Sequence, residues 1–173
     1  MLALLEAFFQ IMTRRGGPED LPDSAFLLQS LVVIYLICQL PVVVIMYGWS
    51  GTTVLLILAD VTLLSVFFWA ILRLTGHEPR FRQTLSALLG TGALLSLVQA
   101  PLVAASRAAP DAASRPAIIT LSLLGLLAWM LFVHAHITAR ALSRHFAIGM
   151  VVALAYFVVS FQVSSRISPP VAG

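Results

Sequence analysis

Five long apolar stretches alternate with short polar segments along this chain of 173 residues. They run at about residues 25–47, 52–74, 84–106, 117–140 and 146–163. A helix needs about 20 mostly apolar residues to cross the hydrocarbon of a bilayer, and each stretch is close to that length. The pattern predicts an all-α, polytopic membrane protein with five transmembrane helices in one domain, residues 25–163, followed by a short tail, residues 164–173.

A different pattern precedes the first apolar stretch. Glu6, Gln10 and Thr13 recur at helical spacing and make a narrow polar stripe. The opposite side is apolar and comprises Leu2, Leu5, Phe8, Phe9 and Met12. This pattern predicts an amphipathic helix lying in the membrane interface, so that residues 1–24 form a cytoplasmic helix and turn. A signal peptide is the alternative, but its basic residues precede the apolar run, and here an arginine pair follows it.

The composition agrees with a bilayer as the solvent. The chain is 60% hydrophobic and only 10% charged, whereas soluble domains carry about 25% charged residues. A soluble fold of this size has no means of hiding so much apolar surface. All ten basic residues are arginine, which is typical of a GC-rich bacterial genome. We therefore expect a multi-pass protein of the bacterial inner membrane.

The arginines are distributed unevenly between the two sides. Seven fall on the side of the N-terminus and three on the other, so the positive-inside rule predicts a cytoplasmic N-terminus and a periplasmic C-terminus. We expect four of the seven to contact lipid headgroups: Arg80, Arg82, Arg140 and Arg144.

Three polar side chains fall at similar depth inside the predicted spans. Asp60 lies near the middle of the second span, where an ionised group costs roughly 2.5–3.5 kcal/mol. Helix rise places Asp60, Gln39 and Gln99 about 10–12 Å below the periplasmic boundary. The helical neighbours of Asp60 are apolar, so its partner must come from another helix. The carboxyl group is either protonated and hydrogen-bonded, or charged beside water.

Prolines follow both glutamines at the same spacing. Pro41 and Pro101 each remove a backbone donor, free a carbonyl one turn earlier and predict a helix kink. A ligand site at the two kinks is the alternative interpretation. The shared spacing also indicates a duplicated helical hairpin with an offset of 60 residues, or else chance similarity between apolar helices. The matching positions are Gln39 with Gln99, Pro41 with Pro101, Trp69 with Trp129, and Arg80 with Arg140.

Other candidate residues point to packing rather than chemistry. Small residues recur every four positions in the third span and predict close approach of another helix: Gly92, Ser96, Ala100 and Ala104. His134 and His136 lie two residues apart, point to opposite faces of a helix and make a poor metal pair. We expect each to bond a backbone carbonyl or a headgroup. Cys38 has no disulfide partner. We find no metal site and no catalytic constellation, and expect no cofactor.

The chain resembles the Yip family of small five-span membrane proteins, some of which interact with Rab proteins. The resemblance rests on the amphipathic start LLEAFFQIMTRRGGPEDLP, on five closely spaced helices, and on the small-residue third span SALLGTGALLSLVQAPL. It implies the five-helix fold in a bacterial branch of the family. It carries over neither Rab binding nor catalytic residues.

Three functions remain open from the sequence. The first is a non-enzymatic membrane protein that packs against partner membrane proteins, lipids or further copies of itself, without a nucleic-acid partner. The second is a small transporter or permease subunit that uses Asp60 and the two Gln-Pro segments. The third is an enzyme acting on a lipid-linked substrate at the arginine-rich face. A deep cavity reaching Asp60 would favour transport, whereas a solid bundle with an apolar groove would favour a partner.

Overall fold

The structure is a computed structural model that describes residues 2–108 and 116–168. Within these ranges it is all helical, as the sequence predicts, and holds no strand. Its elements are α1 (Leu2–Met12), the 3-10 helix η1 (Pro18–Asp20), α2 (Ala25–Tyr47), α3 (Gly51–Leu74), the 3-10 helix η2 (Glu78–Arg80), α4 (Phe81–Ala108), α5 (Ala117–Ala141) and α6 (Phe146–Ile167). Residues 109–115 of the predicted polar loop 107–115, which include Arg115, and residues 169–173 of the predicted tail 164–173 lie outside the described residues.

The five long helices confirm the prediction of five spans. Each is long and apolar enough to cross a membrane. Two differ from the predicted bounds. α4 begins at Phe81 rather than near residue 84, and α6 continues beyond Val163 to Ile167. The apolar stretch marks only the part that suits hydrocarbon, whereas a helix continues into polar residues as long as its backbone hydrogen bonds are made.

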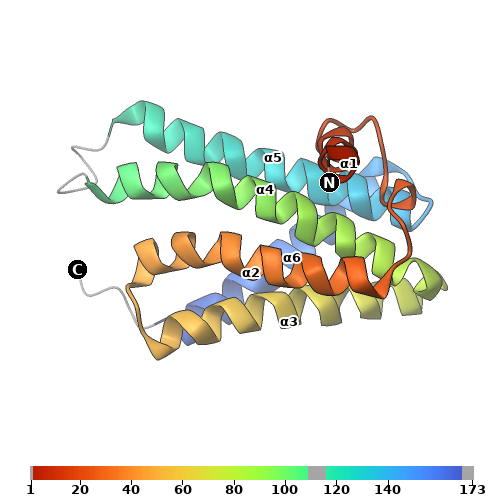
Figure 1. Cartoon of the computed structure of the whole chain (residues 1–173), viewed down its shortest axis with the longest axis horizontal. Helices are drawn as coiled ribbons and strands as arrows, with labels where there is room; N and C mark the ends of the chain where they lie inside the picture. Colours follow the sequence, from red (N-terminus) through yellow and green to blue (C-terminus); the bar gives the residue numbers. More distant parts are fainter. Residues whose placement is uncertain (1, 109–115, 169–173) are drawn as a thin grey trace.

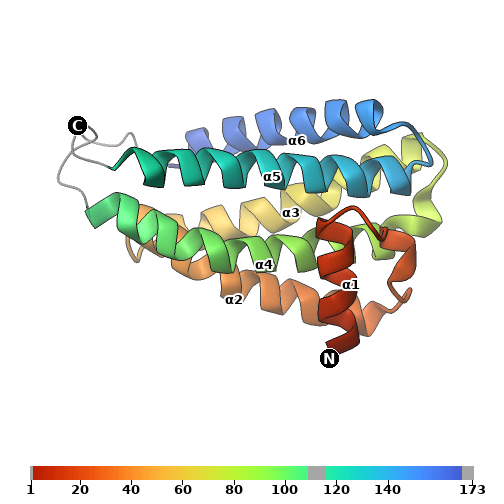
Figure 2. The ribbon, with the colours of Figure 1, turned by 90° about the horizontal axis from the view of Figure 1, so that it is seen from above.

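The long helices run side by side as a bundle (Figure 1), and their contacts close into a ring. In order around it, each packing on the next, are α2, α4, α5, α6 and α3, and α3 closes the ring on α2. The short α1 lies across the bundle rather than along it, over α4 (Figure 2). We call the end of the bundle that carries α1, η2 and the α5–α6 turn the α1 end. The other, with the turn at residues 48–50, is the Trp49 end.

The tightest packing lies toward the α1 end. The buried residues of α5 all fall in its last part, between Val133 and Ala141, and those of α6 in its first part. There Gly149 of α6 sits directly on the backbone of α5, and a Cβ at this position would overlap the Ala135 carbonyl oxygen. The absence of a side chain therefore lets the two helices touch backbone to backbone.

The N-terminal segment, residues 2–16, packs against α4 and α5 at this end. Phe8 and Ile11 of α1 are buried, and the Phe8 ring occupies the space that a side chain at Gly90 would fill. The indole of Trp129 donates to the Met12 carbonyl oxygen (3.3 Å), and His136 Nε2 lies 2.7 Å from the Gly16 carbonyl oxygen. This gives His136 the backbone carbonyl partner that the sequence predicts.

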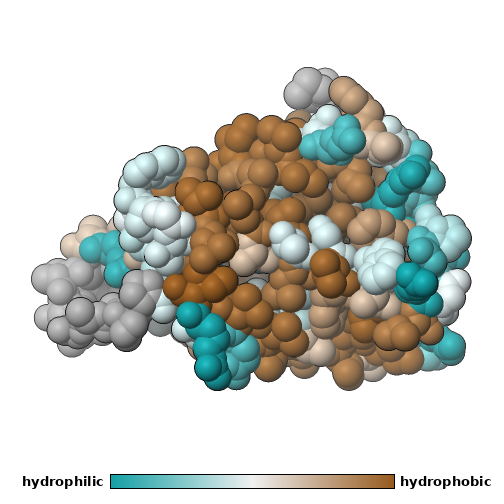
Figure 3. Space-filling model, turned by 90° about the horizontal axis from the view of Figure 1, so that it is seen from below, coloured by the Kyte–Doolittle hydropathy of each residue, from teal (hydrophilic) through white to brown (hydrophobic). Residues whose placement is uncertain are grey.

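Elsewhere the surface of the bundle is apolar. Large side chains stand exposed on every long helix, with Phe26, Leu74 and Val158 among them. Figure 3 shows one face on which hydrophobic residues cover the middle of the molecule and polar residues gather toward its two ends. Exposed apolar surface of this extent suits hydrocarbon rather than water, in agreement with an integral membrane protein.

Candidate functional site

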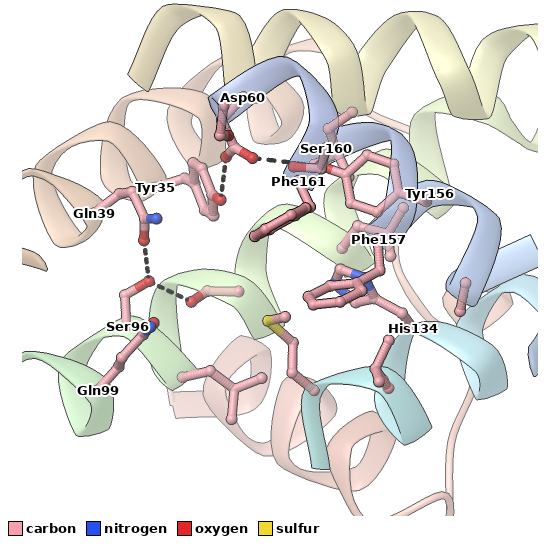
Figure 4. Close-up of a pocket in the computed structure, with 18 of the residues that line it drawn as sticks. Tyr35, Gln39, Asp60, Ser96, Gln99, His134, Tyr156, Phe157, Ser160 and Phe161 are labelled. Atoms are coloured by element: carbon pink, nitrogen blue, oxygen red, sulfur yellow. Dashed lines mark hydrogen bonds between the residues drawn. The ribbon is translucent and has the colours of Figure 1, made fainter. Parts of the chain in front are cut away.

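A pocket of about 340 Å³ lies inside the ring of long helices. Every one of the helices from α2 to α6 contributes to its wall (Figure 4). It extends from Met46 and Ser164, near the Trp49 end, to Leu88 and His134, nearer the α1 end. The polar residues of its wall are Tyr35, Gln39, Asp60, Ser96, Gln99, His134, Tyr156, Ser160 and Ser164.

Asp60 receives hydrogen bonds from two neighbouring helices. The hydroxyl of Tyr35 in α2 donates to Asp60 Oδ2 at 2.6 Å, and that of Tyr156 in α6 donates more weakly to Oδ1 at 3.4 Å. Tyr35 is held in place by Gly92 of α4, because a Cβ there would lie only 2.8 Å from Tyr35 Cε2. The small residue thus makes room for the ring that carries the hydroxyl to Asp60.

The two glutamines share the pocket with Asp60, but neither of them is its hydrogen-bond partner among the described residues. Both line the pocket together with Asp60, so the structure brings the three predicted polar residues to one wall. Gln39 Oε1 accepts from Ser96 Oγ at 2.6 Å, however, and no hydrogen bond joins either glutamine to Asp60 among the described residues. Gln39 therefore ties α2 to α4, while Asp60 ties α3 to α2 and α6.

His134 reaches the same pocket from α5. Its ring centre lies 6.0 Å from that of Tyr156, whose hydroxyl approaches Asp60 (Figure 4). No hydrogen bond or ion pair links His134 to Asp60 within the described ranges. Tyr156 also packs against Phe67 and Phe68 of α3. Tyr156 therefore contacts α3 and lies close to His134 of α5.

Sequence reasoning missed the two tyrosines, although one left a signal. Tyr35 precedes Gln39 by four residues, which places both on one face of α2. Tyr35 lies about one helical turn deeper than Gln39, so a comparison of depth among the amides alone does not identify it. No comparable pattern singles out Tyr156, because its α6 neighbours on every side are apolar or small.

The prolines and arginines also have definite places. Pro41 and Pro101 lie inside α2 and α4, both of which continue through them. Arg80 Nη1 lies within hydrogen-bond distance of the carbonyl oxygens of Arg140 and Ala141 and of Ser143 Oγ, at the end of α5. Two of the other arginines expected at headgroups have acidic partners: Arg82 lies 3.7 Å from an Asp23 carboxylate oxygen, and Arg140 pairs with Glu19. Arg144 is exposed.

Comparisons with known proteins give no assignment. No protein-family model, no curated protein and no solved structure matches the chain. The resemblance to the Yip family and the 60-residue repeat accordingly stay predictions, and function has to be argued from the site.

The arrangement suits binding better than bond chemistry. Asp60 is half-buried and its carboxylate faces a space large enough for a small molecule. No group of three or more His, Cys, Asp or Glu residues gathers in the described parts of the chain as a metal site would require. A lone carboxylate among hydroxyls and amides can hold a proton or a cation and can orient a polar ligand.

Proposed function

We propose that this protein is a small membrane transporter or permease subunit whose solute site is the central pocket. The observation that supports it is the cavity of about 340 Å³ that reaches Asp60 between five membrane-spanning helices. Ionisable residues within a membrane domain that face a cavity typically mark a solute or ion pathway. Volumes of about 300–1,000 Å³ are usual for small-molecule sites.

The two ends of the bundle favour entry from the Trp49 end. Toward the α1 end the helices are closed by the Gly149 contact and by the buried residues Leu72, Ala141 and Leu142. Toward the Trp49 end the pocket wall includes Met46, Phe161 and Ser164, which are exposed or half-buried. The solute therefore reaches Asp60 through this end in the conformation described here.

Labelling of single cysteines tests this proposal. In a Cys38→Ala background, Ser160→Cys places a thiol in the pocket wall, and the matched control Val158→Cys places one on the exposed apolar face of the same helix. A water-borne, membrane-impermeant thiol reagent attacks the thiolate, which forms only where water has access. Ser160→Cys should react in membrane vesicles, while Val158→Cys stays unmodified. Equal inertness of the two positions contradicts the proposal.

A second function, packing against a partner or lipid, is favoured by another feature. An apolar groove of about 780 Å³ lies between α1, α2 and α4 and is lined by Phe8, Leu31, Cys38 and Gly90 among others. The small-residue stripe of α4 contributes less to this function than the sequence suggested, because Gly92 and Ser96 contact α2 within the same chain. Co-purification in mild detergent tests it, and the partner should be lost on Cys38→Trp.

We also propose that the N-terminus is cytoplasmic, in the inner membrane of a bacterium. The described arginines support this orientation because they concentrate at the α1 end. Those of the α1 end are Arg14, Arg15, Arg73, Arg80, Arg82, Arg140 and Arg144, whereas Arg107 and Arg166 belong to the Trp49 end. A reporter fused to the C-terminus should give a periplasmic signal, and a cytoplasmic signal contradicts the orientation.

A further inference from the structure

The central pocket holds one acidic side chain, and no cationic side chain of the described residues is paired with it. Its only carboxylate is that of Asp60, and neither arginine nor lysine is among the described residues of its wall. His134, the remaining titratable nitrogen base of the wall, makes no hydrogen bond or ion pair with Asp60 within the described ranges. α2 and α6 present tyrosine hydroxyls to Asp60, and α4 presents only the uncharged Ser96 and Gln99. No cationic side chain of the described residues is paired with Asp60, so a bound cation can supply its countercharge.

The carboxylate also has unused capacity to accept hydrogen bonds. An ionised carboxylate offers about four lone-pair sites. Tyr35 occupies one at 2.6 Å, and Tyr156 approaches another at the longer distance of 3.4 Å. Each oxygen thus keeps one acceptor position that no described donor occupies. A cationic N–H group or a compact ammonium centre has room to approach there.

The rest of the wall suits the body of an organic cation better than a bare metal ion. Four aromatic residues line the pocket, and the faces of such rings attract cations. They are Tyr35, Tyr156, Phe157 and Phe161. Leu64, Leu95 and Met130 add apolar surface. A hard metal ion needs several oxygen ligands at once, whereas an amine or quaternary ammonium needs one countercharge, aromatic faces and apolar contact.

We propose that the pocket binds a monovalent organic cation, an amine or quaternary ammonium group on a small apolar body, with Asp60 as its counterion. This inference rests on the proposed function and names its substrate class. Tyr35 orients the carboxylate, and the aromatic wall contacts the body of the ligand. The cavity of about 340 Å³ limits the ligand to a small molecule.

Charge-selective labelling tests the inference on the full-length chain. Ser160→Cys in the Cys38→Ala background is treated with two methanethiosulfonate reagents of similar size, one ending in trimethylammonium and the other in sulfonate. Each rate is divided by the rate of the same reagent with a small free thiol, which removes their intrinsic difference. The cationic reagent should react at least tenfold faster than the anionic one, and benzyltrimethylammonium should slow its reaction.

Variants of Asp60 identify the source of that selectivity. Asp60→Asn keeps an oxygen that accepts from Tyr35 but removes the charge, so the rate ratio should fall to about one. Asp60→Glu restores the charge and should restore the ratio. Elution as a single species in gel filtration, together with continued labelling of Ser160→Cys, shows that each variant is folded.

The outcomes separate the two proposals. A ratio near one with Asp60 present, or an unchanged ratio in Asp60→Asn, overturns the cation inference, while the labelling itself still supports a solute pocket. Absence of reaction with either reagent overturns the proposed function and the inference together. Faster reaction of the sulfonate reagent excludes a cation as the ligand.

Discussion

The two ends of the helix bundle are built differently. At the α1 end, backbones touch at Gly149, and Arg80 and Arg140 are matched to partners within the chain. Toward the Trp49 end the same helices enclose a cavity whose wall includes Asp60 and Gln99. Polar groups whose partners lie within the chain hold the bundle together, whereas polar groups that face a cavity remain able to bind something else. The bundle thus has a closely packed end and an end with a cavity, and the proposed solute site lies toward the latter.

The largest effect on this contrast should come from Gly149. Gly149→Ala puts a Cβ into the Ala135 carbonyl oxygen, so α5 and α6 must separate, at a cost of about 1–3 kcal/mol. Gly125→Ala is the matched control, because no atom lies within 4 Å of a Cβ there and alanine favours a helix. Thermal unfolding in detergent should show a loss for the first and no loss for the second. Equal stability of the two variants would contradict the closed α1 end.

A smaller effect is expected at Arg80. Arg80→Met keeps the aliphatic stem and removes the donor to the last carbonyl groups of α5. We expect the free energy of unfolding to fall by about 1–2 kcal/mol, and no further, because water can replace the donor at this exposed site. Arg144→Met serves as the control, since Arg144 is exposed and makes no ion pair with the described residues. The same unfolding measurement distinguishes them. If both arginines are needed only for lipid headgroups, the two variants will lose equally little stability in detergent.

The smallest effect should appear at the tyrosines of the pocket. Tyr35→Phe removes the 2.6 Å hydrogen bond to Asp60 and should lower stability by about 1 kcal/mol. Tyr156→Phe removes only the 3.4 Å contact and should cost less than half as much. Comparison of their unfolding temperatures ranks the two hydrogen bonds. A larger loss for Tyr156→Phe would mean that Asp60 is held mainly by α6.

The sequence predicted the elements well because length and hydropathy determine them. Five apolar stretches of about the thickness of a bilayer gave five helices, and the apolar surroundings of Asp60 in α3 correctly required a partner on another helix. The identity of that partner was out of reach. Tyr35 and Gln39 lie on one face of α2, and a helix that is apolar all round does not show how that face meets α3. The pattern alone therefore does not decide which of the two side chains reaches Asp60.

The arginines illustrate a second limit of sequence reasoning. Counting charges assigned Arg80 to a side of the membrane, yet its contact with the end of α5 depends on two loops that meet only in the folded chain. Residues 60 positions apart come together there, whereas the sequence pattern indicates Arg80 and Arg140 as headgroup contacts and as matching positions of a repeat. Partners that are distant in sequence are set by the arrangement of helices, not by local pattern.

The central claim is that the negative charge of Asp60 serves a cation site and is not needed for the fold. The most direct test is the thermal stability of wild type and Asp60→Asn, each with and without benzyltrimethylammonium. Without ligand the two should unfold within about 0.5 kcal/mol of each other, because asparagine still accepts from Tyr35. Ligand at ten times its Kd should stabilise wild type by about 1.4 kcal/mol and leave Asp60→Asn unchanged. Equal stabilisation of both proteins, or of neither, would contradict the account.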